Sequence, residues 1–309
     1  LLSPAAMAAS DKDKVTIAVG GKNLFYYLPL TIAERKGFFK EEGVNVEIID
    51  FAGGSKALQA VVGGSADVVS GAYEHTISLQ GKKQFFTAFV QQARAPQIVL
   101  AVSTKTMPNY TSIADLKGKK IGVTAPGSST NMVASFVLDG AGLKSTDVSF
   151  VGVGAGAGAV AAMRAGQIDA ISNLDPVIST LEKDGSIKVV TDTRKIEATR
   201  KLFGGDMPAG CLYASEEFLK KYPKAAQSLT NAIVKANRWI AKASGEDVLK
   251  TVPASYHLGD PELYKLTFLN VKEAMSPDGM ISPAGTETAL KALAAYNDKI
   301  DPTAIDLKR

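Results

Sequence analysis

The sequence predicts an α/β protein of two lobes, each with a mostly parallel sheet flanked by helices. Three observations predict this fold: strand patterns alternate with single helical patterns, the same order of elements occurs twice, and two apolar runs allow the chain to pass between lobes. Strands that alternate with single helices are typical of βαβ units, whose strands run parallel. A chain of 309 residues is long enough for two domains of about 100–200 residues each.

The first lobe opens with a strand, a helix and a second strand. KVTIAVGG (14–21) is short and β-branched, LPLTIAERKGFF (28–39) is helical with a proline near its start, and VNVEIIDF (44–51) has strand character. The loop GGS, the helix KALQAVVGG and the strand ADVVSGAY follow over 53–73. This order predicts parallel βαβ units.

The second lobe repeats this order from Lys119. KKIGVTAPGSS gives a strand and loop, TNMVASFVLDGAGL a helix, DVSFVGVGAG a strand and loop, AVAAMRAGQ a helix, and IDAISNLD a strand and loop. The stretches GGSKALQAVVGGSADVVSG (53–71) and AGAGAVAAMRAGQIDAISN (155–173) align without a gap, with Gly54 opposite Gly156. We therefore predict that one architecture occurs twice, about 102 residues apart.

Two apolar runs mark where the chain passes between the lobes. RAPQIVLAVST (94–104) leaves the first lobe, and PAGCLYAS (208–215) returns to it. The predicted division is therefore lobe one at 14–102 and 208–309, and lobe two at 103–207. The mostly helical C-terminal remainder is expected to pack around lobe one.

The N-terminal sequence LLSPAAMAAS indicates export. It is apolar, rich in small residues and contains Ala6-x-Ala8, which is typical of the end of a secretory signal peptide, so residues 1–8 are interpreted as a remnant of one. No later apolar run approaches the roughly 18–20 residues that span a bilayer. Cys211 is the only cysteine, which excludes an internal disulfide and a thiolate-rich metal site, and it is expected to be a small buried hydrophobe. We expect a soluble periplasmic protein.

Composition and motifs give no positive sign of catalysis. Lys and Arg number 35 against 31 Asp and Glu, and they are scattered rather than gathered, which argues against nucleic acid as a partner. Only two histidines occur, and no HExxH, GxSxG or Walker sequence is present. We therefore expect a protein that is not an enzyme and that uses neither a cofactor nor a metal.

The stretch VSFVGVGAGAGAVAAM (148–163) suggests a dinucleotide-binding fingerprint as an alternative. Gly152-x-Gly154-x-x-Ala157 fits the fingerprint loosely, and such a loop would hold a pyrophosphate on backbone N–H groups. The fingerprint usually follows a lobe's first strand, and APGSSTN occupies that place here. We interpret the glycines instead as one wall of a cleft, where the backbone can lie close to a small ligand or to the opposing lobe.

Loops at the carboxyl ends of the strands predict a binding site, since ligands of open parallel sheets bind there. Six loops should face one cleft: GGKNLFYY, AGGS and GAYEHT in lobe one, and APGSSTN, GVGAGAG and SNLDP in lobe two. The segment Gly127 to Thr130 is the strongest element, because its hydroxyls can cap a helix or donate to an anion while free N–H groups point at the ligand. An ordinary helix cap without a ligand is the alternative. Gly54 and Ser55 offer the same chemistry with one hydroxyl fewer.

Other side chains of these loops add candidates. The aromatic residues at 25–27 can wall in an organic body, although two of the three are expected in the core. Tyr73 and His75 follow a strand end directly and are where individual specificity is expected, with a solvated or capping histidine as the alternative. Arg94, beside the predicted hinge, can grip a carboxylate or sulfonate with two hydrogen bonds, or form a structural ion pair.

Three longer stretches carry a family resemblance. They are LPLTIAERKGFFKEEGVNVEIIDFAGGSKALQAVVGGSADVV, SIADLKGKKIGVTAPGSSTNMVASFVLDGAGL and AAMRAGQIDAISNLDP. Together they resemble the solute-binding proteins of nitrate, sulfonate and taurine ABC importers, over about residues 15–230. The resemblance implies a type II two-lobed periplasmic binding protein fold, with two crossover strands as a hinge that closes over a small anion. Gly127 to Thr130 match that family's ligand-capturing helix start, and Asn173 to Pro176 match a loop in which Leu174 replaces an aromatic residue.

The expected function is the extracytoplasmic solute-binding component of an ABC importer. Its ligand would be a small organic anion, sulfonate- or taurine-like first and an aromatic carboxylate next, which a monomer delivers to an inner-membrane permease. Pyrimidine-precursor binding or synthesis on the same fold is the alternative, although the similar synthases rely on a cysteine-rich motif; a dinucleotide oxidoreductase rests on the glycines alone. The predicted ligand contacts are Asn23, Tyr26, Gly54, Ser55, Tyr73, His75, Arg94, Gly127, Ser128, Ser129, Thr130, Asn173 and Asp175.

Overall fold

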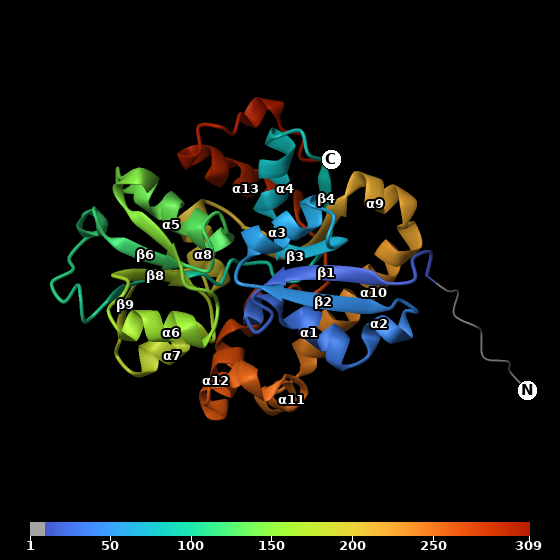
Figure 1. Ribbon diagram of the computed structural model, residues 1–309, viewed down its shortest axis with the longest axis horizontal. Coiled ribbons are helices and arrows are strands. Elements are labelled where there is room, and N and C mark those ends of the chain that lie inside the picture. The colour runs from blue at the N-terminus through green and yellow to red at the C-terminus, as the bar shows by residue number, and fades with distance from the viewer. Residues whose placement is uncertain (1–9) are drawn as a thin grey trace, which may run out of the picture.

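The computed structural model describes residues 10–309, so the signal-peptide remnant predicted at 1–8 lies outside the described residues. Two five-stranded sheets lie side by side, each with helices on its faces (Figure 1). The strand order is β2-β1-β3-β10-β4 in the first sheet and β7-β6-β8-β5-β9 in the second. The α/β fold of two lobes predicted from the sequence is confirmed.

The first sheet is parallel except for one inserted strand. Its strands are β1 (Val15–Gly20), β2 (Val46–Phe51), β3 (Val68–Ala72), β4 (Phe86–Gln91) and β10 (Gly210–Ser215). β1 pairs parallel with β2 and β3, whereas β10 pairs antiparallel with β3 and β4. The N-terminal helices of this lobe are α1 (Leu28–Arg35), α2 (Phe38–Glu41), α3 (Gly54–Val62) and α4 (Glu74–Gly81).

The second sheet has the same design. Its strands are β5 (Val99–Ser103), β6 (Lys120–Val123), β7 (Ser149–Gly152), β8 (Ala170–Asn173) and β9 (Ile187–Asp192). β5 is inserted antiparallel between β8 and β9, as β10 is between β3 and β4, so the duplication seen in the sequence is present in the topology. The helices of this lobe are α5 (Ser129–Gly140), α6 (Ala157–Arg164), α7 (Val177–Lys183) and α8 (Ile196–Phe203).

Sheet membership moves the predicted boundary between the lobes. All five residues of β5 pair with β8 or β9, so the boundary drawn at 102/103 falls inside a strand of the second sheet. A central strand is apolar because it is buried on both faces and paired on both sides. The apolar character of 94–104 therefore does not tell to which of the two sheets the strand belongs. Lobe one therefore ends before Val99, and its chain resumes close to the predicted residue 208, with β10 beginning at Gly210.

The C-terminal helices contact both lobes. They are α9 (Glu216–Lys221), α10 (Pro223–Lys242), α11 (Gly245–Thr251), α12 (Pro261–Val271) and α13 (Pro283–Tyr296). α10 packs on α1, α2 and β4, as expected, but α12 also packs on α7 and α13 on α5 (Figure 1). The region therefore packs on lobe one, as the sequence predicts, and two of its helices also reach across the lobe boundary.

Burial explains the local structure. β1 is VTIAVG, with five of its six residues buried, as expected for a strand covered on both faces. Phe25 stacks on Tyr264 with ring centroids 4.5 Å apart, and Cys211 is a fully buried small side chain, as predicted.

Within residues 10–309, no helix combines the length and the apolar character needed to cross a membrane.

Candidate ligand site between the lobes

Five of the six predicted loops meet at a small cavity between the sheets. The segment GVGAGAG is the exception, although its Ala155 touches lobe one nearby. The cavity is about 20 Å³, which holds about one water molecule. Six of the predicted contacts line it: Tyr26, Gly54, His75, Ser128, Ser129 and Thr130.

The start of α5 supplies backbone donors to this cavity. After β6, Gly127 turns the chain with a φ of +84°, and Ser128 has the extended conformation of a helix cap. The first N–H groups of a helix have no acceptor within it and lie at the positive end of its dipole. Ser129, the first residue of α5, lines the cavity. The free N–H groups at this end of the helix are therefore placed as in known anion-binding sites.

The hydroxyls beside Ser129 have structural roles. Ser128 does not cap its own helix; its Oγ accepts from the backbone N–H of Ser55 at 3.0 Å and bonds to Ser55 Oγ at 3.1 Å. Thr130 Oγ1 accepts from the N–H of Thr124 at 3.1 Å. Ser129 is therefore the hydroxyl of this segment that is left for a ligand.

Hydrogen bonds join the lobes around the cavity. Ser55 Oγ donates to the carbonyl of Pro126 at 2.9 Å, and Asn23 Nδ2 donates to the carbonyl of Ala155 at 2.8 Å. His75 Nε2 lies 3.2 Å from the carbonyl oxygen of Gly127, so Nε2 carries the proton in this contact because a carbonyl only accepts. The lobes are closed on each other in this structure.

The Tyr26 hydroxyl is buried without a partner. Tyr26 is 2% exposed, and its hydroxyl has no hydrogen bond to any residue in the described part of the chain. Burial raises the pKa of Tyr26 well above its ordinary value, and the Glu74 carboxylate adds to this. The Ser129 side chain, which lies beside the phenol without a hydrogen bond of normal geometry, opposes it, and the phenol stays a neutral donor. A buried donor without an acceptor costs about 1–3 kcal/mol, which a ligand acceptor would recover.

Tyr26→Phe is therefore expected to leave the ligand-free protein as stable as the parent or slightly more stable. The matched control is Tyr256→Phe, because Tyr256 is also buried but its hydroxyl bonds to Thr31 Oγ1 at 3.0 Å. Losing that hydrogen bond should cost about 1 kcal/mol. Urea unfolding of both variants measures the difference. An equal loss in both would show that the Tyr26 hydroxyl has a partner after all.

Four predicted contacts have other partners. Arg94 is exposed, and its Nε donates to the carbonyl of Glu273 at 2.8 Å. Asn173 Nδ2 donates to the carbonyl of Gly154 at 3.0 Å, and the Asp175 carboxylate accepts from the N–H of Ser179 at 2.8 Å. Asn23 donates to Ala155, as described above. In this structure these side chains hold loops in place and do not line the cavity.

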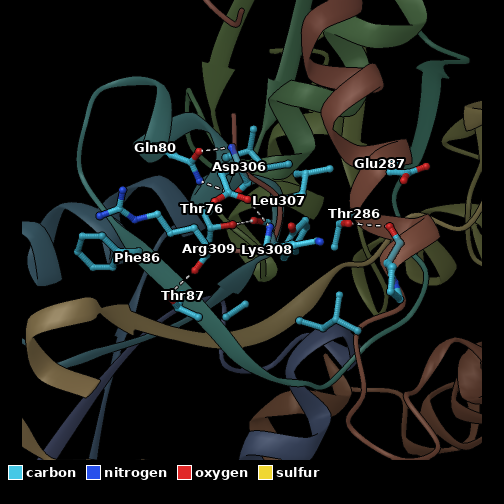
Figure 2. Close-up of a pocket in the computed structure, with 15 residues that line it drawn as sticks. Thr76, Gln80, Phe86, Thr87, Thr286, Glu287, Asp306, Leu307, Lys308 and Arg309 are labelled. Carbon is cyan, nitrogen blue, oxygen red and sulfur yellow. Dashed lines mark hydrogen bonds between the residues drawn. The ribbon is translucent and has the colours of Figure 1, made fainter. Parts of the chain in front are cut away.

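Tyr73 lines a different cavity, of about 480 Å³, between α4, β4, the start of α13 and the chain end (Figure 2). Gln80 holds one wall by accepting from the N–H of Asp306 and donating to its carbonyl. Burial raises the pKa of Tyr73 to about 12. Tyr73 and His75, two residues apart, thus face separate cavities.

The sequence-based prediction missed some residues that line the cavity. Thr124 directly follows β6, and Ile98 lies in the first crossing between the lobes. The position of Thr124 after a strand was a usable signal, because ligands bind at strand ends. Nothing local to Ile98 distinguishes it from a core residue.

Comparison with known proteins decides the family. The family model described as NMT1-like family matches residues 9–252. The chain belongs to the NMT1-like family. Among solved structures, this NMT1-like protein is similar to a protein from Bordetella bronchiseptica RB50, with 61% identity, a TM-score of 0.96, and 97% of this chain and 95% of that chain covered.

More distant matches of the NMT1-like protein fix the fold. The alkanesulfonate-binding protein SsuA from Xanthomonas axonopodis pv. citri has a TM-score of 0.73 at 20% identity, with 94% of each chain covered. Curated relatives include YtlA of Bacillus subtilis (strain 168), 26% identical with 90% of this chain and 83% of YtlA covered. The 4-amino-5-hydroxymethyl-2-methylpyrimidine phosphate synthase THI13 of Saccharomyces cerevisiae is 24% identical, with 74% of this chain and 67% of THI13 covered. The two-lobed periplasmic binding protein fold is confirmed.

Proposed function

We propose that this NMT1-like protein is the extracytoplasmic solute-binding component of an ABC importer. It captures a small organic anion between its lobes in the periplasm, as a monomer, and delivers it to a permease of the inner membrane. The name of the structural relative SsuA supports this class of function, since that protein binds alkanesulfonates. The residues of the cavity support the choice of an anion.

One observation carries the proposal: the start of α5 and the unpartnered Tyr26 hydroxyl line the same buried cavity. Among the described residues that line it there is no Lys, Arg, Asp or Glu, so recognition falls to neutral donors. Helix N–H groups and hydroxyls bind anions well, and hydrogen bonds to a charged group are stronger than neutral ones. The three oxygens of a sulfonate suit donors that converge from both lobes, while Tyr26 and Tyr27 supply the wall that favours an aromatic carboxylate as the second choice.

The small volume of the cavity requires the lobes to separate before an organic ligand binds. Rotation about the two crossings, before β5 and before β10, would open the cleft. A ligand that contacts both lobes binds the closed state better than the open one and thereby favours closure. The hydrogen bonds between Ser55 and lobe two would re-form as the lobes close.

A thermal-shift screen of taurine, ethanesulfonate, benzoate, nitrate and a pyrimidine tests this proposal, because a ligand that binds only the folded state raises the melting temperature. We expect a sulfonate to give the largest shift. Ser129→Ala should then weaken binding of that anion by about 10–100-fold, the value of a hydrogen bond to a charged group. Ser228→Ala on α10 is the control and should bind like the parent. No shift with any anion would contradict the proposal.

Synthesis of a pyrimidine phosphate is the second candidate, because THI13 is among the relatives. Cys211, the single cysteine, is fully buried, and burial raises the pKa of its thiol, so it is not a reactive nucleophile. Binding without catalysis is therefore the function we prefer. A shift with the pyrimidine alone would favour this second candidate.

A further inference from the structure

A groove of about 870 Å³ adjoins the interlobe cavity. Its walls come from α3 and α4 of lobe one, from the segment 126–135 of lobe two, and from the end of α13 with the residues that follow it. Among residues 10–309, His75 is the one residue that lines both the groove and the cavity. His75 therefore stands between the groove and the predicted ligand site.

The groove carries positive charge. Lys82 and Lys299 line it, and both are exposed. Neither ammonium group forms an ion pair or a hydrogen bond with any described residue, and the backbone N–H of Lys299 donates to Asn297 Oδ1. No Asp or Glu of the described chain lines the groove; Asp298 and Asp301, which flank Lys299 in the sequence, are not on its walls. A cleft with charges of one sign concentrates ions of the opposite sign.

The inner end of the groove is closed by contacts between the lobes. Ser55, His75, Pro126 and Gly127 all line the groove, and their hydrogen bonds join its two walls. His75 makes one of these contacts through Nε2, while its Nδ1 is buried with no partner in residues 10–309. The ring is thus held by a single hydrogen bond at 3.2 Å, and moving it connects the groove to the cavity.

Building on the proposed function, we propose that this groove is the path of the anion into the cleft. Lys82 and Lys299 attract the anion to the groove. His75 is the gate, because its contact with the Gly127 carbonyl joins the two lobes and breaks when they separate, which lets the anion reach the start of α5. The lysines lie outside the cavity, so they act on the rate of association rather than on the bound complex. Their effect must weaken with salt, because exposed charges are screened beyond about 8 Å at physiological ionic strength.

Stopped-flow tyrosine fluorescence tests this, since Tyr26 and Tyr27 line the cavity. The probes are ethanesulfonate and benzoate, and the variant is Lys82→Glu with Lys299→Glu. Its control is Lys105→Glu with Lys117→Glu, two exposed lysines of lobe two away from the groove that change the net charge equally. We expect the groove variant to associate about tenfold more slowly at low salt, with little change at high salt or in the dissociation rate. His75→Ala should raise both the association and the dissociation rate.

The outcomes separate the two proposals. A parent protein that binds neither probe nor any other anion refutes the proposed function, and this inference with it. A parent that binds, with a groove variant as fast as the parent or no slower than the control variant, refutes the path alone. Slower association confined to the groove variant, with faster rates in both directions for His75→Ala, supports the path and the gate.

Discussion

Arg194→Ala is expected to lower the free energy of unfolding by about 3–5 kcal/mol, because it leaves a buried carboxylate without its partner. Arg194 is 6% exposed and Asp175 is 1% exposed. The guanidinium lies 3.4 Å from Asp175 Oδ2, 2.6 Å from Glu182 Oε1 and 2.8 Å from Asp192 Oδ2. Three carboxylates thus share one buried cation.

The loss should depend on pH. Burial raises the pKa of Asp175 above its ordinary value of 3.8, against the opposing effect of Arg194. A carboxyl whose pKa is raised on folding contributes stability at low pH, and this is lost as the pH rises above the unfolded value. Without Arg194 the pKa of Asp175 rises further, so the variant should lose more stability at neutral pH than near pH 4.

A surface ion pair provides the control for Arg194→Ala. Arg164 Nε lies 2.6 Å from Asp184 Oδ2, but the Arg164 side chain is 50% exposed. Arg164→Ala should cost no more than about 1 kcal/mol, because water screens exposed pairs. Urea unfolding, monitored by circular dichroism near pH 4 and at neutral pH, measures the free energy of unfolding of the parent and of both variants. Equal losses in the two variants would show that the buried network contributes no more than a surface pair.

Arg194 also illustrates what sequence patterns do not reveal. Asp175 was predicted as a ligand contact from its loop, yet its partner lies 19 residues later, beyond α7 and β9. Pairing between distant charges depends on tertiary packing, which local periodicity does not encode. The backbone of Asp175 is nevertheless at the lobe boundary, since its carbonyl accepts from the N–H of Phe25 at 3.2 Å. Arg194 therefore holds the loop that carries Asp175 in place without lining the predicted site itself.

The fold was predictable because its signals are local. Alternating strands and helices predict the two mostly parallel sheets, and the gap-free alignment of 53–71 with 155–173 predicts their duplication. The loops of the site followed from strand ends. Side-chain direction did not follow: Tyr73 and His75 are separated by one residue at the start of α4, where a helix turns each successive side chain by about 100°. One therefore lines the cavity behind α4 and the other the interlobe cavity.

Gly53→Ala is expected to weaken ligand binding without destabilising either lobe. Gly53 caps α3 with a φ of −163°, an extended conformation that alanine adopts freely. In the closed structure, an added Cβ would lie 2.7 Å from Ala125 Cβ and 2.8 Å from Ser128 Oγ, both in lobe two. The three atoms nearest to the added methyl group all belong to lobe two, so its closest clashes form when the lobes close. Overpacking of about 1–3 kcal/mol on the closed state would weaken binding by about 5–150-fold.

Gly156→Ala is the matched control for Gly53→Ala. Gly156 caps α6, the equivalent helix of lobe two, its φ is −141°, and no atom lies within 4 Å of an added Cβ. Isothermal titration with the anion selected by the thermal-shift screen should show weaker binding for Gly53→Ala alone, and small-angle scattering should show that its ligand-free form is more open. Both variants should unfold at the parent's urea concentration. If Gly53→Ala binds the anion as tightly as the parent and is equally compact, the methyl group meets nothing when the lobes close. The ligand-bound lobes would then lie further apart than they do in this structure.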